Sequence, residues 1–96
     1  MADVKVLKDG ELTDSCITAI VGKKDAKEMR DAFSKEFNKP DISYPNTDDK
    51  RAKMIMGVFE YWDELEMAGK PVKYAKTEDE LKTQIKDEVI NLFKEW

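Results

Sequence analysis

Histidine and cysteine, two side chains that many enzymes use for nucleophilic and acid–base chemistry, are almost absent from this sequence. It has 96 residues, no histidine and a single cysteine, Cys16. Without an imidazole, neither a Ser-His-Asp triad nor a Cys–His pair can form, and metal sites built from His or clustered Cys are excluded. We therefore expect no enzyme, no bound metal and no cofactor. Because Cys16 opens an apolar run, we expect a buried structural thiol and a reducing, cytoplasmic location.

Carboxylates are abundant, and three of them gather within one short segment. Glu60, Asp63 and Glu64 are spaced so that a helix would bring them to one side. The Glu60–Glu64 pair is mildly destabilising, and carboxylates in the C-terminal half of a helix oppose its dipole. Helical carboxylates alone rarely enclose a hard cation. They are therefore either a solvated face or an acidic patch that meets a basic partner.

The segment that carries these carboxylates, residues 48–68, is apolar around most of a helix. At ~100° per residue its apolar side chains span about 240°, whereas the apolar stripe of a surface helix spans ~100°. One interpretation is a central core helix that is covered on both sides. The other is that Met54, Tyr61 and Met67, at the margins of the arc, contact a partner, since Met and Tyr suit adaptable contact surfaces.

The loop at 38–47 offers a further contact. Pro40 and Pro45 restrict its conformations, and Tyr44 either folds back on the core or presents its ring to a partner. The sequence thus yields one set of candidate partner-binding residues: Tyr44, Met54, Glu60, Tyr61, Asp63, Glu64 and Met67.

These candidates need a scaffold, and the hydrophobic pattern predicts a mixed one. Alternation and β-branched residues favour strands at 3–8, 15–21 and 71–76. Asp9-Gly10 is a hairpin signal. Helical periodicity, with a capping residue at the start of each run (Asp25, Thr47 and Thr77), predicts helices over the ranges 25–38, 48–68 and 77–96.

This order of elements predicts an α+β fold. We expect a small antiparallel or mixed sheet of about three strands covered by three helices, in the order β-β-α-α-β-α, as a single domain over residues 1–96. A helical domain with a marginal hairpin is the alternative. In either fold, the stripe of Leu81, Ile85, Val89 and Leu92 should belong to the core.

The net charge of the chain bears on which classes of partner it can bind. The chain has 17 basic and 21 acidic residues, a net charge of −4, and most of the acidic excess lies in residues 48–96. Without a basic cluster or a Gly-rich phosphate loop, we expect no direct nucleic-acid binding. The start of the chain has no apolar signal region, and no apolar run is long enough to cross a membrane.

Together these observations favour a small acidic protein that acts by docking. We expect an inhibitor, adaptor or accessory subunit, of the kind that phages and mobile elements encode, which covers a basic surface of a larger enzyme. The alternative is a homo-oligomeric structural protein or one that sequesters a small ligand.

Overall fold

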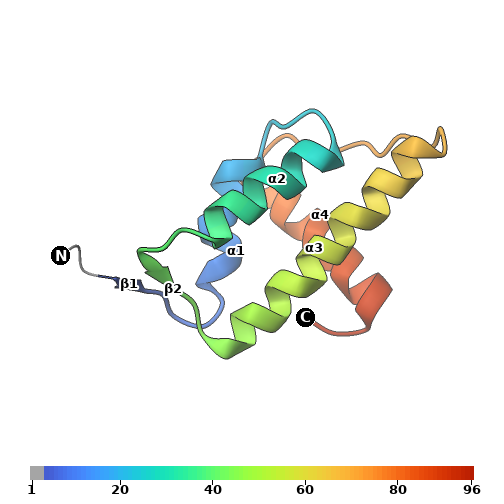
Figure 1. Ribbon diagram of the computed structural model, residues 1–96. Coiled ribbons are helices and arrows are strands. Elements are labelled where there is room, and N and C mark those ends of the chain that lie inside the picture. Colours follow the sequence, from blue (N-terminus) through green and yellow to red (C-terminus); the bar gives the residue numbers. More distant parts are fainter. Residues whose placement is uncertain (1–3) are drawn as a thin grey trace.

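The computed structural model describes residues 4–96, which form four helices and two very short strands (Figure 1). The helices are α1 (Glu11–Ile20), α2 (Ala26–Phe37), α3 (Asn46–Met67) and α4 (Glu78–Phe93). Each helix packs on the next, and α4 also packs on α1, so the four close into a ring. In Figure 1, α2 and α3 form the front layer and α1 and α4 lie behind them.

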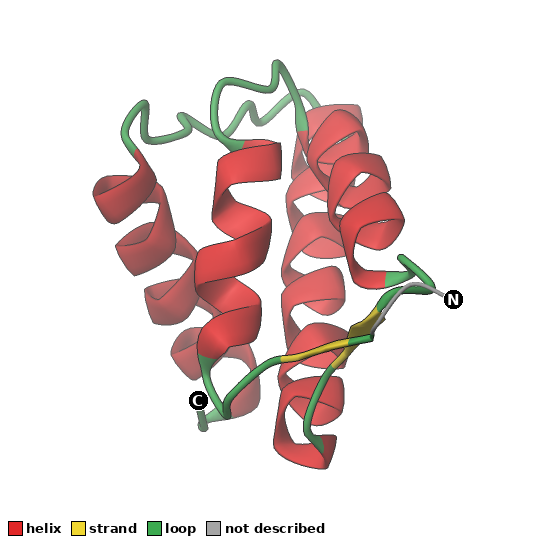
Figure 2. Ribbon diagram, turned by 90° about the vertical axis from the view of Figure 1, so that its left-hand side faces the viewer, coloured by secondary structure: helices red, strands yellow, loops and turns green. Residues whose placement is uncertain are grey.

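The two strands are β1 (Lys5–Val6) and β2 (Ile42–Ser43), which pair in parallel. The backbone N–H of Leu7 donates to the carbonyl oxygen of Ser43 at 3.1 Å, which extends the pairing by one residue. Figure 2 shows this pair crossing one end of the helices. It ties the segment before α1 to the loop between α2 and α3.

The expected three-stranded sheet under three helices is wrong. The segment 15–21, expected as a strand, is the second half of α1 and the residue after it. Leu12, Cys16 and Ile20 recur every four residues on its buried side, so helical packing overrides the β-propensity of this run. The range 71–76 forms no strand. Of the strand expected at 3–8, residue 3 lies outside the described residues, and only the two residues of β1 are a strand in the part from 4 to 8.

The Asp9-Gly10 turn begins a helix and not a hairpin. Gly10 has a φ of +90°, a conformation that suits glycine, and it is the N-terminal cap of α1. The partner of β1 is therefore β2, from the segment 38–47 that we expected to be a loop.

The three expected helices are confirmed, with small shifts at their ends. The side chain of Asp25 accepts from the backbone N–H of Glu28 at 2.9 Å, and Thr77 caps α4 by accepting from Glu80 at 3.3 Å. Thr47, the expected cap of the second helix, lies inside α3, which begins at Asn46 after Pro45.

The core lies between the helices and explains most of the wide apolar arc of α3. Phe59 packs edge-on against Phe33 of α2, and the indole nitrogen of Trp62 donates to Glu88 of α4 at 3.1 Å. Two flanks of α3 are therefore covered. From α4, the side chains of Leu81, Ile85 and Val89 are buried as expected, whereas Leu92 is 36% exposed and the prediction was wrong for it.

Cys16 is buried, as expected, although in a helix and not in a strand. Burial, with a smaller contribution from the charge of Glu36, raises the pKa of its thiol to about 12. The thiol is therefore protonated at neutral pH and is a poor nucleophile.

Candidate functional site

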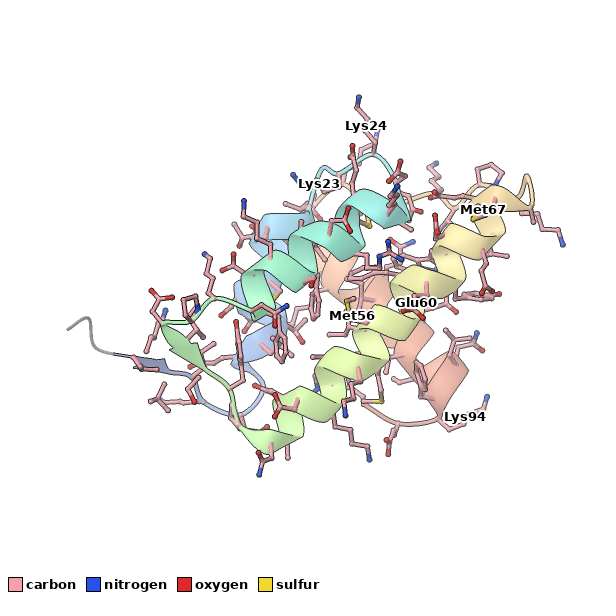
Figure 3. The ribbon with its side chains drawn as sticks, in the orientation of Figure 1. Lys23, Lys24, Met56, Glu60, Met67 and Lys94 are labelled. Carbon is pink, nitrogen blue, oxygen red and sulfur yellow. The ribbon has the colours of Figure 1, made fainter. Side chains whose placement is uncertain are left out.

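One side of α3 is only partly covered by the other helices. We call it the outer face of α3, and it comprises Asp49, Lys53, Met56, Gly57, Glu60, Asp63, Glu64 and Met67. These residues recur at three- and four-residue spacing, which places them on one side of a helix. Figure 3 shows Met56, Glu60 and Met67 along this side. Glu60 and Glu64 are exposed, and Met67 is 80% exposed.

The structure brings together four of the candidate partner-binding residues and separates the other three. Glu60, Asp63, Glu64 and Met67 share the outer face. Met54 lies about 120° around the helix from Glu60 at ~100° per residue and is only 6% exposed. Met54 is therefore a core residue.

Tyr61 and Tyr44 are also held by the core. Tyr61 is half-buried and packs against the hydrophobic core. The ring of Tyr44 stacks on that of Phe37 with 5.0 Å between centroids. Burial raises the pKa of the Tyr44 phenol to about 12. Tyr44 thus folds back on the core, one of the two arrangements that the sequence left open.

The acidic side chains of the outer face have no counter-ions. Between residues 54 and 69 the sequence has four acidic residues and no basic residue. Glu66 is engaged, because it accepts from the hydroxyl of Tyr74 and from the backbone N–H of Ala26. Within residues 4–96, Glu60, Asp63 and Glu64 form no ion pair and no side-chain hydrogen bond.

Their place along α3 makes these three charges unfavourable. The helix ends at Met67, so Asp63 and Glu64 lie in its last turns, where the helix dipole is negative. Glu60 adds a like charge four residues before Glu64, which is also destabilising. A cation supplied from outside the chain would relieve both effects.

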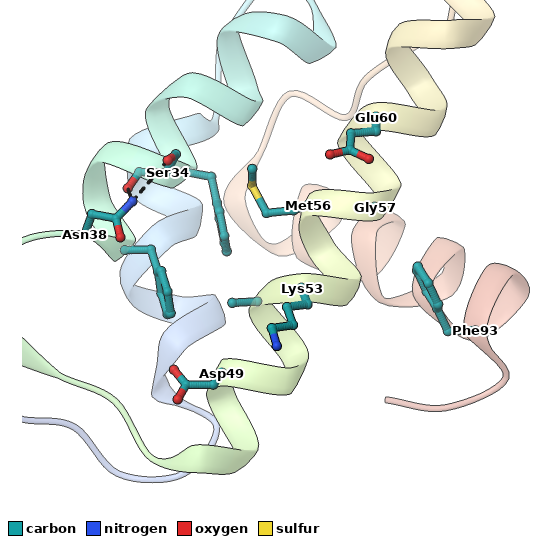
Figure 4. Close-up of a pocket in the computed structure, with 11 residues that line it drawn as sticks. Ser34, Asn38, Asp49, Lys53, Met56, Gly57, Glu60 and Phe93 are labelled. Atoms are coloured by element: carbon teal, nitrogen blue, oxygen red, sulfur yellow. Dashed lines mark hydrogen bonds between the residues drawn. The ribbon is translucent and has the colours of Figure 1, made fainter.

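A groove of about 800 Å3 runs between α2 and α3 beside this face (Figure 4). Its apolar lining comes mainly from Phe33, Phe37, Ala52 and Met56. Its polar edges are Ser34 and Asn38 on α2 and Asp49, Lys53 and Glu60 on α3. The amide nitrogen of Asn38 donates to the carbonyl oxygen of Ser34 at 2.8 Å, so the α2 edge is held by its own bonds.

Gly57 extends the groove across α3 toward the end of α4. A Cβ atom at this position would lie 2.7 Å from Cζ of Phe93, so the ring would have to shift if any other residue replaced this glycine. Glycine inside a helix costs about 1 kcal/mol relative to alanine. Phe93 remains 42% exposed and adds an aromatic surface to the outer face.

Sequence reasoning missed Gly57, Phe93 and the groove itself. A single glycine inside a strongly helical pattern was the available signal, since such a residue often marks a close approach. The groove gave no local signal, because its two walls come from separate helices.

The described part of the chain offers contact chemistry. In residues 4–96, no cluster of three or more His, Cys, Asp or Glu side chains is placed to hold a metal ion. None of the helices in this range has the length and apolar character needed to span a bilayer. Comparisons of this chain with protein-family models, with curated protein sequences and with solved structures each found no match.

Proposed function

We propose that this protein acts without catalysis, by docking the outer face of α3 onto a basic surface of a larger protein. It would serve as an inhibitor, adaptor or accessory subunit. The observation that carries the proposal is the uncompensated acidic row of Glu60, Asp63 and Glu64. In the free protein this row weakens α3, and a basic partner would turn the same charges into favourable contacts.

Apolar side chains beside the acidic row support the same proposal. Met67 is 80% exposed and Phe93 is 42% exposed. Desolvated apolar anchors provide most of the affinity of an interface, while charges around them set the association rate and exclude wrong partners. The outer face of α3 has both kinds of side chain.

The test is capture of the partner from the source organism with matched charge variants. The wild-type chain and two double variants are used as bait: E60K/E64K on the outer face and D41K/D87K elsewhere on the surface. Both variants change the net charge by the same amount, and circular dichroism checks their folding. We expect the same larger protein with the wild type and with D41K/D87K, and its loss with E60K/E64K. Retention by both variants would contradict the proposal.

Self-association is a second candidate, and a charge difference between two helices supports it. Residues 23–39, which include α2, carry six basic and four acidic side chains, whereas residues 54–69 carry four acidic and none that is basic. A two-fold axis along the groove would place α2 of one copy over α3 of the other. Light scattering across a range of concentration and salt tests this: a dimer that dissociates in high salt would support it.

The cytoplasm is the compartment that we propose. Cys16 is the one cysteine of the chain and is a free, buried thiol. Free thiols are typical of proteins kept in reducing surroundings. Fractionation of source cells with an antibody against the chain would test this location.

A further inference from the structure

We propose that the groove between α2 and α3 seats one amphipathic, basic α-helix of the partner. This inference rests on the proposed function and deepens it, because it names the partner element and its position. The groove lies beside Glu60, at one edge of the outer face of α3. A segment that occupies it would therefore also reach the acidic row.

The walls of the groove indicate that the occupant is a helix. Both walls are helices, α2 and α3, whose backbone N–H and C=O groups bond within each helix. An extended segment in this groove would find few backbone partners for its own polar groups. A helix satisfies those groups internally and needs only a matching apolar stripe, as in other helix-in-groove complexes.

The length of the groove suits a short helix. Its charged edge on α3 runs from Asp49 to Glu60, which is about 16 Å at ~1.5 Å per residue, or three turns. Met56 and Phe37 provide the apolar surface between these ends. Three turns of a partner helix present apolar anchors at positions i, i+4 and i+7 on one side.

Charge along the edge gives the sign and spacing of the partner residues. Within residues 4–96, none of Asp49, Lys53 and Glu60 takes part in an ion pair. Cations of the partner would lie at the two ends of the groove, near Asp49 and Glu60. A neutral or acidic side chain suits the position near Lys53. With Asp63 and Glu64 beyond one end, the net charge that a partner helix meets is negative.

Synthetic peptides of about 15 residues, long enough for about four turns, test this inference on the full chain. The first has leucine at helical spacing and lysine elsewhere. The second replaces each leucine with alanine at equal charge, and the third replaces each lysine with glutamate. Titration calorimetry gives the affinity, and circular dichroism gives the conformation of the bound peptide.

We expect the leucine–lysine peptide to bind roughly tenfold or more tightly than the alanine–lysine peptide, because burying even one leucine is worth that much. It should become helical on binding, and the leucine–glutamate peptide should bind weakly. Met56→Ser should remove the preference for leucine. Ile90→Ser is the control, because it removes an exposed apolar side chain of α4 that lies outside both the groove and the outer face of α3, and it should keep the preference.

Several outcomes would overturn the helix-in-groove inference. If the leucine–lysine and alanine–lysine peptides bind equally well, and only E60K/E64K weakens their binding, then docking by charge is still supported but the groove is not the binding site. Equal binding of the leucine–lysine and leucine–glutamate peptides would show an apolar site without charge selection. A bound peptide that stays non-helical would show that the groove takes an extended segment. A dimer of the free chain that Met56→Ser dissociates would show that the groove takes a second copy of the chain. Loss of partner capture by D41K/D87K as well as E60K/E64K would instead count against the proposed function.

Discussion

Asp48, near the start of helix α3, and the acidic row near its end lie in opposite surroundings. Near its start, the side chain of Asp48 is fully buried, and its Oδ1 atom accepts from the backbone N–H of Gly10 at 3.0 Å and from Nη1 of Arg51 at 2.9 Å. Near its end, Glu60 and Glu64 are exposed and have no partner within residues 4–96. One helix therefore holds both a structural carboxylate and unengaged carboxylates.

The charges at the buried end are engaged within the chain. Asp48 lies in the first turn of α3, where the helix dipole favours an anion. Arg51 continues the contact toward the end of the chain: its guanidinium lies 4.9 Å from the ring centroid of Trp96 and donates to the carbonyl oxygen of that residue at 3.3 Å. The charges at this end thus join α1, α3 and the segment after α4. Near the other end, Glu66 is held by Tyr74 and Ala26, whereas Glu60, Asp63 and Glu64 form no ion pair and no side-chain hydrogen bond within residues 4–96.

Removing the buried carboxylate should produce the largest effect. Asp48→Ala leaves the Arg51 guanidinium without its carboxylate partner, and breaking a buried pair costs about 3–5 kcal/mol. That is a large part of the roughly 5–10 kcal/mol by which a domain of this size is stable. Urea denaturation measures the loss. Asp49→Ala, at the exposed neighbouring position, should change the free energy of unfolding by less than about 0.5 kcal/mol, and similar losses for both variants would remove the contrast.

Replacing a buried residue of α4 should likewise cost more stability than replacing an exposed residue of the same helix. Ile85 is 1% exposed and Leu92 is 36% exposed. Ile85→Ala removes buried methyl groups and should cost about 2–5 kcal/mol. Leu92→Ala should cost less than about 1 kcal/mol, because its side chain already meets solvent. Thermal denaturation followed by circular dichroism checks both values, and an equal loss would show that the end of α4 belongs to the core.

The buried thiol of Cys16 should make stability depend on pH in a narrow alkaline window. Its folded-state pKa of about 12 lies above the ordinary value of 9.0. As the pH rises above 9.0, the unfolded chain loses this proton first, so the free energy of unfolding falls, with a limiting slope of about 1.4 kcal/mol per pH unit. The Tyr44 phenol, whose ordinary pKa is 10.0, adds to the fall at higher pH. Urea midpoints at pH 9 and 10 should therefore differ less for Cys16→Ala, which keeps the contributions of the raised phenol pKa values of Tyr44 and Tyr74, than for the wild type.

Three of the four helices could be predicted from the sequence, whereas α1 could not. Helices α2 and α4 have a capping residue and a clear apolar period, and the long helix from about 48 to 68 could be predicted although its expected cap, Thr47, lies inside α3. The run from Ser15 to Val21 is rich in β-branched residues and apolar on both faces, so local preference favoured a strand. Its helical form depends on contacts with α2 and α4, which no local pattern contains.

The same limit applies to the candidate site. The acidic row could be predicted, because Glu60, Asp63 and Glu64 belong to one helix and their relative positions follow from its period. The groove could not, because it combines α2 and α3 with Phe93 from the end of α4. Met54 shows the converse error: its place at the margin of the apolar arc predicted exposure, but neighbouring helices cover that margin.

The smallest expected change in stability is that of E60K/E64K. It best distinguishes carboxylates that stabilise the fold from carboxylates that have no partner. E60K/E64K replaces two carboxylates with two ammonium groups toward the negative end of the helix dipole, while the like-charge repulsion between the two positions remains, so it should stabilise the free protein by about 0.3–1 kcal/mol. Added salt should reduce the gain, since exposed charges are screened. The same variant should lose its partner in the capture experiment, with the loss arising mainly from slower association.

A gain in stability together with a loss of binding would identify carboxylates that serve an interface at a cost to the fold. The matched D41K/D87K variant separates this effect from that of net charge, because its reversed side chains lie outside α3. Urea denaturation at low and at high salt gives the comparison. If E60K/E64K lowers stability, these carboxylates have favourable partners within the chain, and the contrast between the two ends of α3 fails.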